Sequence, residues 1–258
     1  MTAALLEVQG LGRDFGGLRA VHDLSFAVEA GRVKALIGPN GAGKTTTLDI
    51  IAGALAPSRG RVLLDGRPLP AAGPHAVAAR GVARTFQLAR LFGDMTVLDN
   101  VLVGCHVRAR AGWGACAVRS RAMREEERRL HERARAVLAR VGLTAREDVT
   151  AGALPYGEQR LVELARALAM APRLLLLDEP GAGLDGDEHR RLAGLIAAIR
   201  DDGTAVLLVD HHIDFVMDVS DTVVVLCHGE KLAEGPPEAV RRDAAVIAAY
   251  LGAEDDGC

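Results

Sequence analysis

Two patterns of apolar positions alternate along the chain and predict different elements. Continuous apolar runs occupy residues 33–37, 174–177, 206–209 and 223–226. Such runs are typical of parallel strands that are covered on both faces, where no side chain has to meet water. Residues 158–169 and 188–200 instead repeat their apolar positions with a helical period. This alternation predicts an α/β fold built around a parallel sheet.

The beginning of the chain has a different pattern. Residues 7–29 consist of short alternating pieces separated by glycines, which predicts antiparallel strands and turns. Residues 61–64 are followed by Asp65-Gly66, a dipeptide typical of a tight hairpin turn. We therefore expect a small antiparallel subdomain in addition to the parallel sheet.

The middle of the chain, from about residue 88 to about residue 154, lacks strand-like runs and is predicted to be helical. Its most charged part, residues 119–140, carries many arginines interspersed with glutamates. One interpretation is a solvated helix with ion pairs between residues four apart. The other is a basic surface that lies near anionic lipid. We favour the first, because charge runs usually form solvated faces.

Composition and charge narrow the possible partners. The chain has 258 residues, a net charge of −3 and 3% aromatic residues. This argues against a nucleic-acid partner, because nucleic-acid binders are usually basic and often stack bases on aromatic side chains. The four cysteines form no C-x-x-C pair, which argues against a zinc site. No uncharged apolar run approaches the roughly 18 residues that span a bilayer, so we expect the chain not to cross a membrane by itself.

The strongest chemical motif is a phosphate-binding loop. Residues 38–45 (GPNGAGKT) match G-x-x-x-x-G-K-[ST] at every specified position, between a predicted strand and a predicted helix. The glycines let the backbone wrap a phosphate, while the loop amides and the helix N-terminus face the anion. We expect Lys44 to reach the β- and γ-phosphates and the Thr45 hydroxyl to bind Mg²⁺. The nucleotide-binding residues expected in this segment are Gly38, Asn40, Gly41, Gly43, Lys44, Thr45 and Thr46.

A pair of carboxylates supplies the second half of the predicted site. A phosphate-binding loop needs a carboxylate at the end of a buried strand to complete the Mg²⁺ ligands. Asp178 follows four consecutive leucines, at the carboxyl end where open α/β sheets place their ligands. Glu179 comes next, and adjacent strand residues point in opposite directions, so the two carboxylates should differ in role. We expect Asp178 to bind the metal and Glu179 to act as a base on the attacking water.

These motifs, together with four further segments, resemble the ATP-binding subunit of ABC transporters. Residues 154–160 (LPYGEQR) resemble the family's L-S-G-G-Q signature, which contacts ATP held by the opposite subunit. Three shorter matches follow the family's order: residues 85–87 (TFQ) resemble the Q-loop, 183–185 (GLD) the D-loop and 209–211 (VDH) the switch region. The resemblance therefore covers nearly the whole chain.

The resemblance also implies roles for single residues. Gln87 is expected to take part in catalysis and in the Mg²⁺ site, and His211 to contact the γ-phosphate as a further catalytic residue. Phe15 lies where the family places an aromatic ring that stacks on adenine. The nucleotide contacts implied in the signature segment are Leu154, Tyr156, Gly157 and Glu158. The chain departs from the pattern at Pro155, which replaces the signature serine and has neither a hydroxyl nor an amide proton.

Within the family, the chain is similar to branched-chain amino-acid importers. The segments that carry this similarity are residues 82–87, 90–92, 95–101 and 246–252 and the tyrosine of LPYG. Importers of urea, amides or short peptides use similar subunits, so these cargoes are alternatives. A soluble ABC ATPase without a transport role is another, although such proteins usually fuse two cassettes or carry long coiled-coil insertions. A GTPase or kinase is disfavoured by the signature helix and by the absence of the guanine-reading N-K-x-D.

The resemblance implies an α/β fold with a P-loop NTPase (RecA-like) core, an antiparallel β subdomain and an inserted helical signature subdomain. We expect the core at about residues 1–87 and 165–235, the helical subdomain at about 88–164 and a helical tail at about 236–258. The implied cofactors are ATP and Mg²⁺. The implied partners are a second ABC ATPase chain (a related chain rather than a second copy), two integral membrane permease subunits and, indirectly, an external substrate-binding protein. The expected location is the cytoplasmic face of the cell membrane, as a peripheral subunit.

Overall fold

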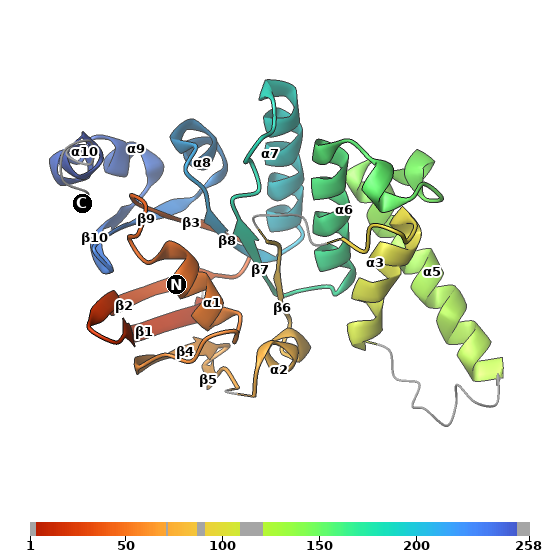
Figure 1. Ribbon diagram of the computed structural model, residues 1–258, viewed down its shortest axis with the longest axis horizontal. Helices are drawn as coiled ribbons and strands as arrows, with labels where there is room; N and C mark the ends of the chain where they lie inside the picture. Colours follow the sequence, from red (N-terminus) through yellow and green to blue (C-terminus); the bar gives the residue numbers. More distant parts are fainter. Residues whose placement is uncertain (1–3, 71, 87–90, 109–120, 252–258) are drawn as a thin grey trace. The chain divides into compact units, whose positions relative to one another are not determined.

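The computed structural model describes residues 4–70, 72–86, 91–108 and 121–251. The chain divides into two compact units, one formed by Met1–Gln87 with Arg173–Cys258 and the other by Leu88–Pro172. Figure 1 labels the elements of both. The second unit includes the whole of a helix that ends at Ala169.

A six-stranded sheet organises the first unit. Its strand order is β10-β9-β3-β8-β7-β6, and the five strands from β9 to β6 run parallel. The bounds are β3 (Val33–Ile37), β6 (Val82–Arg84), β7 (Leu174–Asp178), β8 (Ala205–Val209), β9 (Thr222–Cys227) and β10 (Glu230–Gly235). All residues of β3, β7 and β8 are buried, which confirms the prediction of strands covered on both faces. The apolar pattern of the sequence did not reveal the antiparallel edge strand β10, because most of its residues are exposed and need not be apolar.

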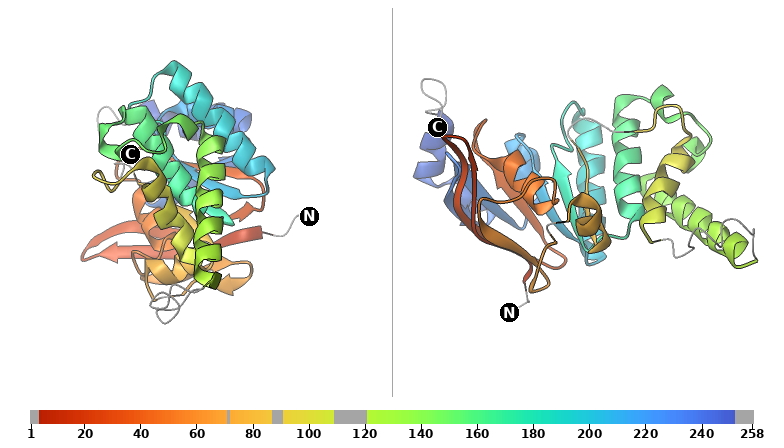
Figure 2. Two further views of the ribbon diagram at one scale, coloured as in Figure 1. Left: turned by 90° about the vertical axis from the view of Figure 1, so that its right-hand side faces the viewer. Right: turned by 60° about the horizontal axis from the view of Figure 1, so that its bottom comes forward.

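An antiparallel sheet of four strands forms the second layer of this unit. Its order is β2-β1-β4-β5, with β1 at Ala4–Phe15, β2 at Leu18–Glu29, β4 at Arg59–Leu64 and β5 at Arg67–Pro68. The predicted hairpin is confirmed, and Asp65 and Gly66 both take the positive φ that its turn requires. Apolar residues of both sheets and of helix α1 (Lys44–Ile51) form one continuous core. Helix α1, which follows the phosphate-binding loop, contacts both β2 and β7. Figure 1 labels these elements, and Figure 2 shows the same ribbon from two further directions.

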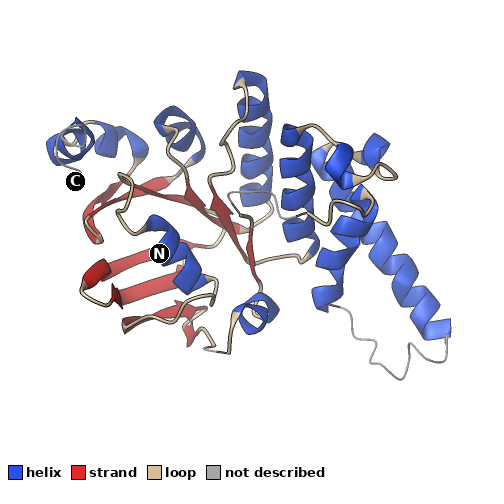
Figure 3. Cartoon of the chain, in the orientation of Figure 1, coloured by secondary structure: helices blue, strands red, loops and turns tan. Residues whose placement is uncertain are grey.

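The remaining helices of the first unit flank the sheets (Figure 3). They are α2 (Pro74–Ala79), α7 (Gly186–Asp201), α8 (Ile213–Val219), α9 (Pro237–Arg241) and α10 (Ala244–Leu251). Helix α7 begins with a complete capping box. The Asp185 side chain accepts a hydrogen bond from the backbone amide of Glu188, and the Glu188 side chain accepts one from the backbone amide of Asp185. This cap fixes the point at which the chain leaves the D-loop segment.

The second unit is helical, as predicted. It contains α3 (Val97–Cys105), α5 (Arg121–Val141) and α6 (Tyr156–Ala169), with 3-10 turns at His106–Arg108, Thr144–Arg146 and Ala151–Ala153. The three α-helices contact one another. On α5, Arg128 pairs with Glu125 and Glu132, and these side chains are largely exposed. This agrees with the solvated, ion-paired interpretation of the charged segment. Among the described helices, none combines the length and the apolarity needed to span a bilayer.

Candidate functional site

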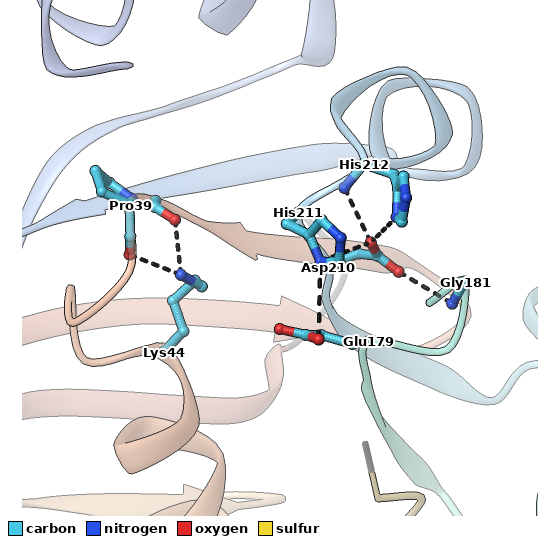
Figure 4. A network of polar contacts seen from close by, with 8 residues as sticks. Pro39, Lys44, Glu179, Gly181, Asp210, His211 and His212 are labelled. Atoms are coloured by element: carbon cyan, nitrogen blue, oxygen red, sulfur yellow. Dashed lines mark hydrogen bonds and ion pairs between the residues drawn. The ribbon is translucent and has the colours of Figure 1, made fainter. Parts of the chain in front are cut away.

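The phosphate-binding loop places Lys44 at the start of α1, where its ammonium group bridges the loop (Figure 4). The Lys44 Nζ donates to the Gly38 carbonyl at 2.6 Å and to the Pro39 carbonyl at 2.8 Å. Burial lowers the pKa of Lys44, and the nearby charges of Glu179 and Asp178 oppose that shift. The Lys44 ammonium is therefore partly desolvated and points into the loop, which favours binding of an anion there.

Three glycines explain why the loop follows this path. A Cβ atom on Gly38 would lie 2.1 Å from the Leu226 carbonyl oxygen, and one on Gly43 would lie 2.3 Å from the Ala20 carbonyl oxygen. Both positions also have positive φ, so only glycine fits there. Gly41 is exposed, with φ of +80°, and a Cβ atom added to it would have no neighbouring atom within 4 Å. The loop is thus tight against the sheet on one side and open at Gly41, as a phosphate cradle requires. Asn40 and Thr45 are exposed beside it, and Thr46 is partly buried.

The two carboxylates lie in different environments. Asp178 is the last residue of β7, and its side chain is 7% exposed. Glu179 follows with φ of +46°, in the left-handed region, and its amide donates to the Val209 carbonyl at 2.7 Å. Its side chain is 23% exposed. A non-glycine residue in this region is strained, and its backbone conformation ends the strand directly after Asp178.

The switch region brings His211 to Glu179. His211 Nδ1 lies 3.7 Å from Glu179 Oε2, whereas the neighbouring His212 ring meets the buried Asp210 at 3.0 Å (Figure 4). Asp210 Oδ2 also accepts the Gly181 amide at 3.1 Å. Asp210 therefore ties His212 to the segment that leads into the D-loop, which leaves His211 as the histidine that faces Glu179. His211 is the histidine to which the switch-region resemblance assigned the γ-phosphate contact.

Arg84 is a member of this site that the motifs did not predict. Its guanidinium donates to Asp178 Oδ2 at 2.9 Å and to Asp49 Oδ1 at 2.5 Å, and its side chain is 9% exposed. Burial disfavours its charge, but the hydrogen bonds and charges of the two aspartates outweigh burial and raise its pKa. The only sequence signal was an arginine next to the Q-loop match, which is uninformative by itself.

Tyr250 is a second residue that sequence reasoning missed. It lies on α10 near the end of the described chain, and its side chain hydrogen-bonds to the main chain of Gly38, the first glycine of the phosphate-binding loop. Burial raises the pKa of Tyr250 to about 12, although that hydrogen bond opposes the shift. The helical tail is therefore attached to the loop rather than separate from it.

Phe15 and Gln87 were expected to stack on adenine and to form the Q-loop, and only Phe15 lies within the described residues. Phe15 ends β1 with its ring 46% exposed, and the Arg13 guanidinium lies 4.6 Å from the ring centroid. An exposed ring backed by a cation can accept a planar base, so its position is compatible with the expected role. Gln87 lies outside the described residues. Thr85, two residues earlier, is buried, and its amide donates to the Leu176 carbonyl of β7 at 3.0 Å.

The signature segment is described within the helical unit. Pro155 is the N-cap of α6 and offers no side-chain cap, Leu154 before it is buried, and Tyr156 opens the helix with its ring 42% exposed. The first helical turn, at Gly157 and Glu158, leaves backbone amides unpaired within the helix. The Glu158 carboxylate pairs with Arg146, with Nε and Oε2 3.2 Å apart. This segment therefore presents a helix N-terminus that can face an anion.

These residues fit a magnesium nucleotide. The half-buried ammonium of Lys44, the amides of the open loop and the closely packed glycines suit a phosphate chain. The hydroxyl of Thr45 and the carboxylate of Asp178 are oxygen donors of the kind that Mg²⁺ prefers. The only described counter-ion that contacts Asp178 is Arg84, which binds Oδ2.

Sequence comparisons agree with this geometry. A family model described as "ABC transporter" matches residues 21–182, and one described as "Branched-chain amino acid ATP-binding cassette transporter" matches residues 230–256. The high-affinity branched-chain amino acid transport ATP-binding protein BraF of Pseudomonas aeruginosa is 43% identical, over 98% of this chain and 99% of that protein. The corresponding LivG of Escherichia coli K12 is 40% identical over the same shares.

Solved structures show the same fold. A nucleotide-free ATP-binding cassette from an ABC transporter superimposes with a TM-score of 0.84 at 29% identity, covering 96% of this chain and 99% of that chain. An ATP-binding cassette in its ADP conformation superimposes equally well at 28% identity, covering 97% of this chain and 100% of that chain.

Proposed function

Because the chain belongs to the ABC transporter family, we propose that it hydrolyses ATP to drive an importer of branched-chain amino acids. The observation that carries the ATPase proposal is the arrangement of Lys44, Asp178, Glu179 and His211 around one phosphate-binding loop. The cargo rests on the relatives' names and on the family match at residues 230–256. Urea, amide and short-peptide importers remain the alternative cargoes, because cargo recognition in the family lies in other subunits.

In the proposed mechanism, the γ-phosphoryl group is transferred to water. Lys44 and the loop amides stabilise the charge on the phosphates. Thr45 and Asp178, together with Gln87, would hold Mg²⁺, which would neutralise charge on the phosphates. Glu179 takes the proton of the attacking water, and His211, which lies beside it, holds the γ-phosphate.

We propose that two ATPase chains enclose the nucleotides between them, with the signature segment of each facing the phosphate-binding loop of the other. In that arrangement Leu154, Tyr156, Gly157 and Glu158 contact the partner's ATP. A related chain is the favoured partner, and two permease subunits hold the pair at the cytoplasmic face of the membrane. No nucleic acid takes part, in keeping with the net charge of −3.

Reconstitution tests this proposal. The chain is expressed with its candidate permease and ATPase partners, the complex is placed in liposomes, and ATP-dependent uptake is measured for leucine, isoleucine, valine, urea and short peptides. We expect uptake of branched-chain amino acids only. Uptake of urea or a peptide instead would overturn the cargo, and ATP hydrolysis by a complex that lacks membrane subunits, with no uptake by any assembly, would favour the soluble alternative.

Phe92 is predicted to contact the permease. Phe92 is 50% exposed. The buried side chain of Asn100 fixes its backbone, since it accepts a hydrogen bond from the Phe92 amide at 2.9 Å and donates one to the Phe92 carbonyl at 3.0 Å. A large apolar ring held rigidly at the surface suits a docking site. Phe92→Glu should lower uptake at least tenfold and leave ATP affinity unchanged, because it lies outside the phosphate loop. Val107, which is 46% exposed in the same unit, provides the control Val107→Glu. Parallel loss of ATP affinity, or equal effects of both variants, would contradict this prediction.

The signature segment yields a prediction about Pro155. A serine at this N-cap would supply a hydroxyl that can donate to the partner's γ-phosphate, and a hydrogen bond to a charged group contributes roughly 1.5–3 kcal/mol. Pro155→Ser should therefore raise hydrolysis about tenfold at the ATP held by the partner's loop. Pro155→Ala is the matched control, because it restores the amide proton without the hydroxyl. Single-turnover measurements at each site check the prediction, and identical rates for the two variants would refute it.

A further inference from the structure

Arg84 links three segments that come from separate parts of the chain. It ends β6, just before the Q-loop match, and its two terminal nitrogens reach different carboxylates. Nη2 donates to Asp178 on β7, and Nη1 donates to Asp49 on α1, the helix that begins with Lys44. The Phe86 ring also lies against the guanidinium, with its centroid 5.2 Å away.

The geometry leaves Asp178 able to bind a metal. Arg84 contacts only Oδ2, and a carboxylate has two oxygens with about four acceptor positions in total. The other partner, Asp49, has a side chain 37% exposed and binds the other terminal nitrogen of the guanidinium. Because guanidinium is planar with a rigid fork of donors, two fixed partners define its plane and hence the orientation of the carboxylate that it holds.

We propose that Arg84 is a positioning residue for Mg²⁺: it holds Oδ2 of Asp178 so that Oδ1 faces the metal, and it links that orientation to the segment leading to Gln87. Partners that hydrogen-bond a metal's ligands orient them, and losing one typically lowers metal affinity or activity about 10–100-fold. A displacement of β6 or of the Phe86 segment would change the metal site through this guanidinium. This inference rests on the proposed Mg²⁺-ATP site.

Charge alone makes the opposite prediction. A cation 2.9 Å from a metal ligand repels Mg²⁺, so removing Arg84 would strengthen metal binding if electrostatics dominated. Lysine separates the two effects, because it keeps the charge but presents a single ammonium that cannot hold two carboxylates in a fork. Arg84→Lys and Arg84→Met therefore give different results under the two accounts.

The test measures equilibrium ATP binding to the purified chain, once with saturating MgCl₂ and once with EDTA. The quantity compared is the factor by which Mg²⁺ strengthens ATP binding. We expect Arg84→Lys and Arg84→Met to lower this factor about tenfold while the affinity in EDTA stays near that of the wild type. Asp49→Ala removes only the second partner of Arg84 and should give a smaller reduction; the partly exposed side chain of Asp49 makes this the variant to use if Arg84→Lys does not fold.

Lys34 provides the control for loss of a buried cation. It forms an ion pair with Glu234, with Nζ and Oε1 2.5 Å apart and its own side chain 9% exposed, at a position on β3 outside the phosphate loop. Lys34→Met should lower thermal stability without changing the Mg²⁺ factor. A wild-type factor in Arg84→Lys, or a larger factor in Arg84→Met, would overturn the proposal. If Mg²⁺ does not strengthen binding in the wild type, the proposed Mg²⁺-ATP site itself fails.

Discussion

Glu179→Gln should abolish most ATP turnover and leave Mg²⁺-ATP binding nearly unchanged. A positioned general base contributes about 10²–10⁴-fold to a rate, and glutamine has the same shape but cannot accept the proton. Glu179 is separated from the metal-binding role of Asp178 by its left-handed backbone and by its position beside His211. Because binding survives while hydrolysis stops, the variant should accumulate as a closed pair of ATPase chains.

Phosphate release by the reconstituted complex and size-exclusion chromatography with ATP check this prediction. Asp178→Asn is the matched comparison, since it also replaces one carboxylate by an amide in the adjacent position. That change should weaken ATP binding in the presence of Mg²⁺ and leave binding in EDTA near the wild-type level. Wild-type turnover in Glu179→Gln would show that another group acts on the water.

Lys44→Met should lower ATP affinity by at least 100-fold and abolish uptake. Each hydrogen bond between a charged pair contributes roughly 1.5–3 kcal/mol, and lysine is expected to meet two phosphates. The lost interactions are strong because the ammonium already lies in a partly buried loop, where it has replaced water by the Gly38 and Pro39 carbonyls. Isothermal titration of ATP measures the change. Lys34→Met, which removes a cation elsewhere on the same sheet, should bind ATP normally.

The lowered pKa of Lys44 adds a pH dependence to this prediction. Burial lowers the pKa in the free protein, and bound phosphate must raise it again because it favours the charged form. ATP affinity is then fully present below the pKa of the free protein and is lost as the pH rises through the pKa of the bound state. Wild-type affinity should therefore fall at alkaline pH, whereas the weak residual affinity of Lys44→Met should not. A wild-type affinity that is constant into the alkaline range would contradict the assigned role.

The sequence located the buried strands of the parallel sheet and the motifs that they carry. Apolar runs located β3, β7, β8 and β9, because strands buried on both faces need apolar residues at every position. The glycines and Lys44 located the phosphate-binding loop, since few loops other than one that wraps an anion combine tight turns with a lysine at this spacing. The family resemblance is confirmed by relatives that match almost the whole chain.

Contacts between distant segments followed only from the tertiary structure. Arg84, Asp49 and Asp178 meet because β6 pairs with β7 while α1 packs against β7, an arrangement that no local pattern encodes. Likewise, the family resemblance pointed to His211, but only the fold shows that His211 lies beside Glu179 while the neighbouring His212 pairs with the buried Asp210. The physical reason is that periodicity and turn chemistry act over a few residues, whereas the pairing of side chains from separate strands depends on strand order and on what each buried charge can reach.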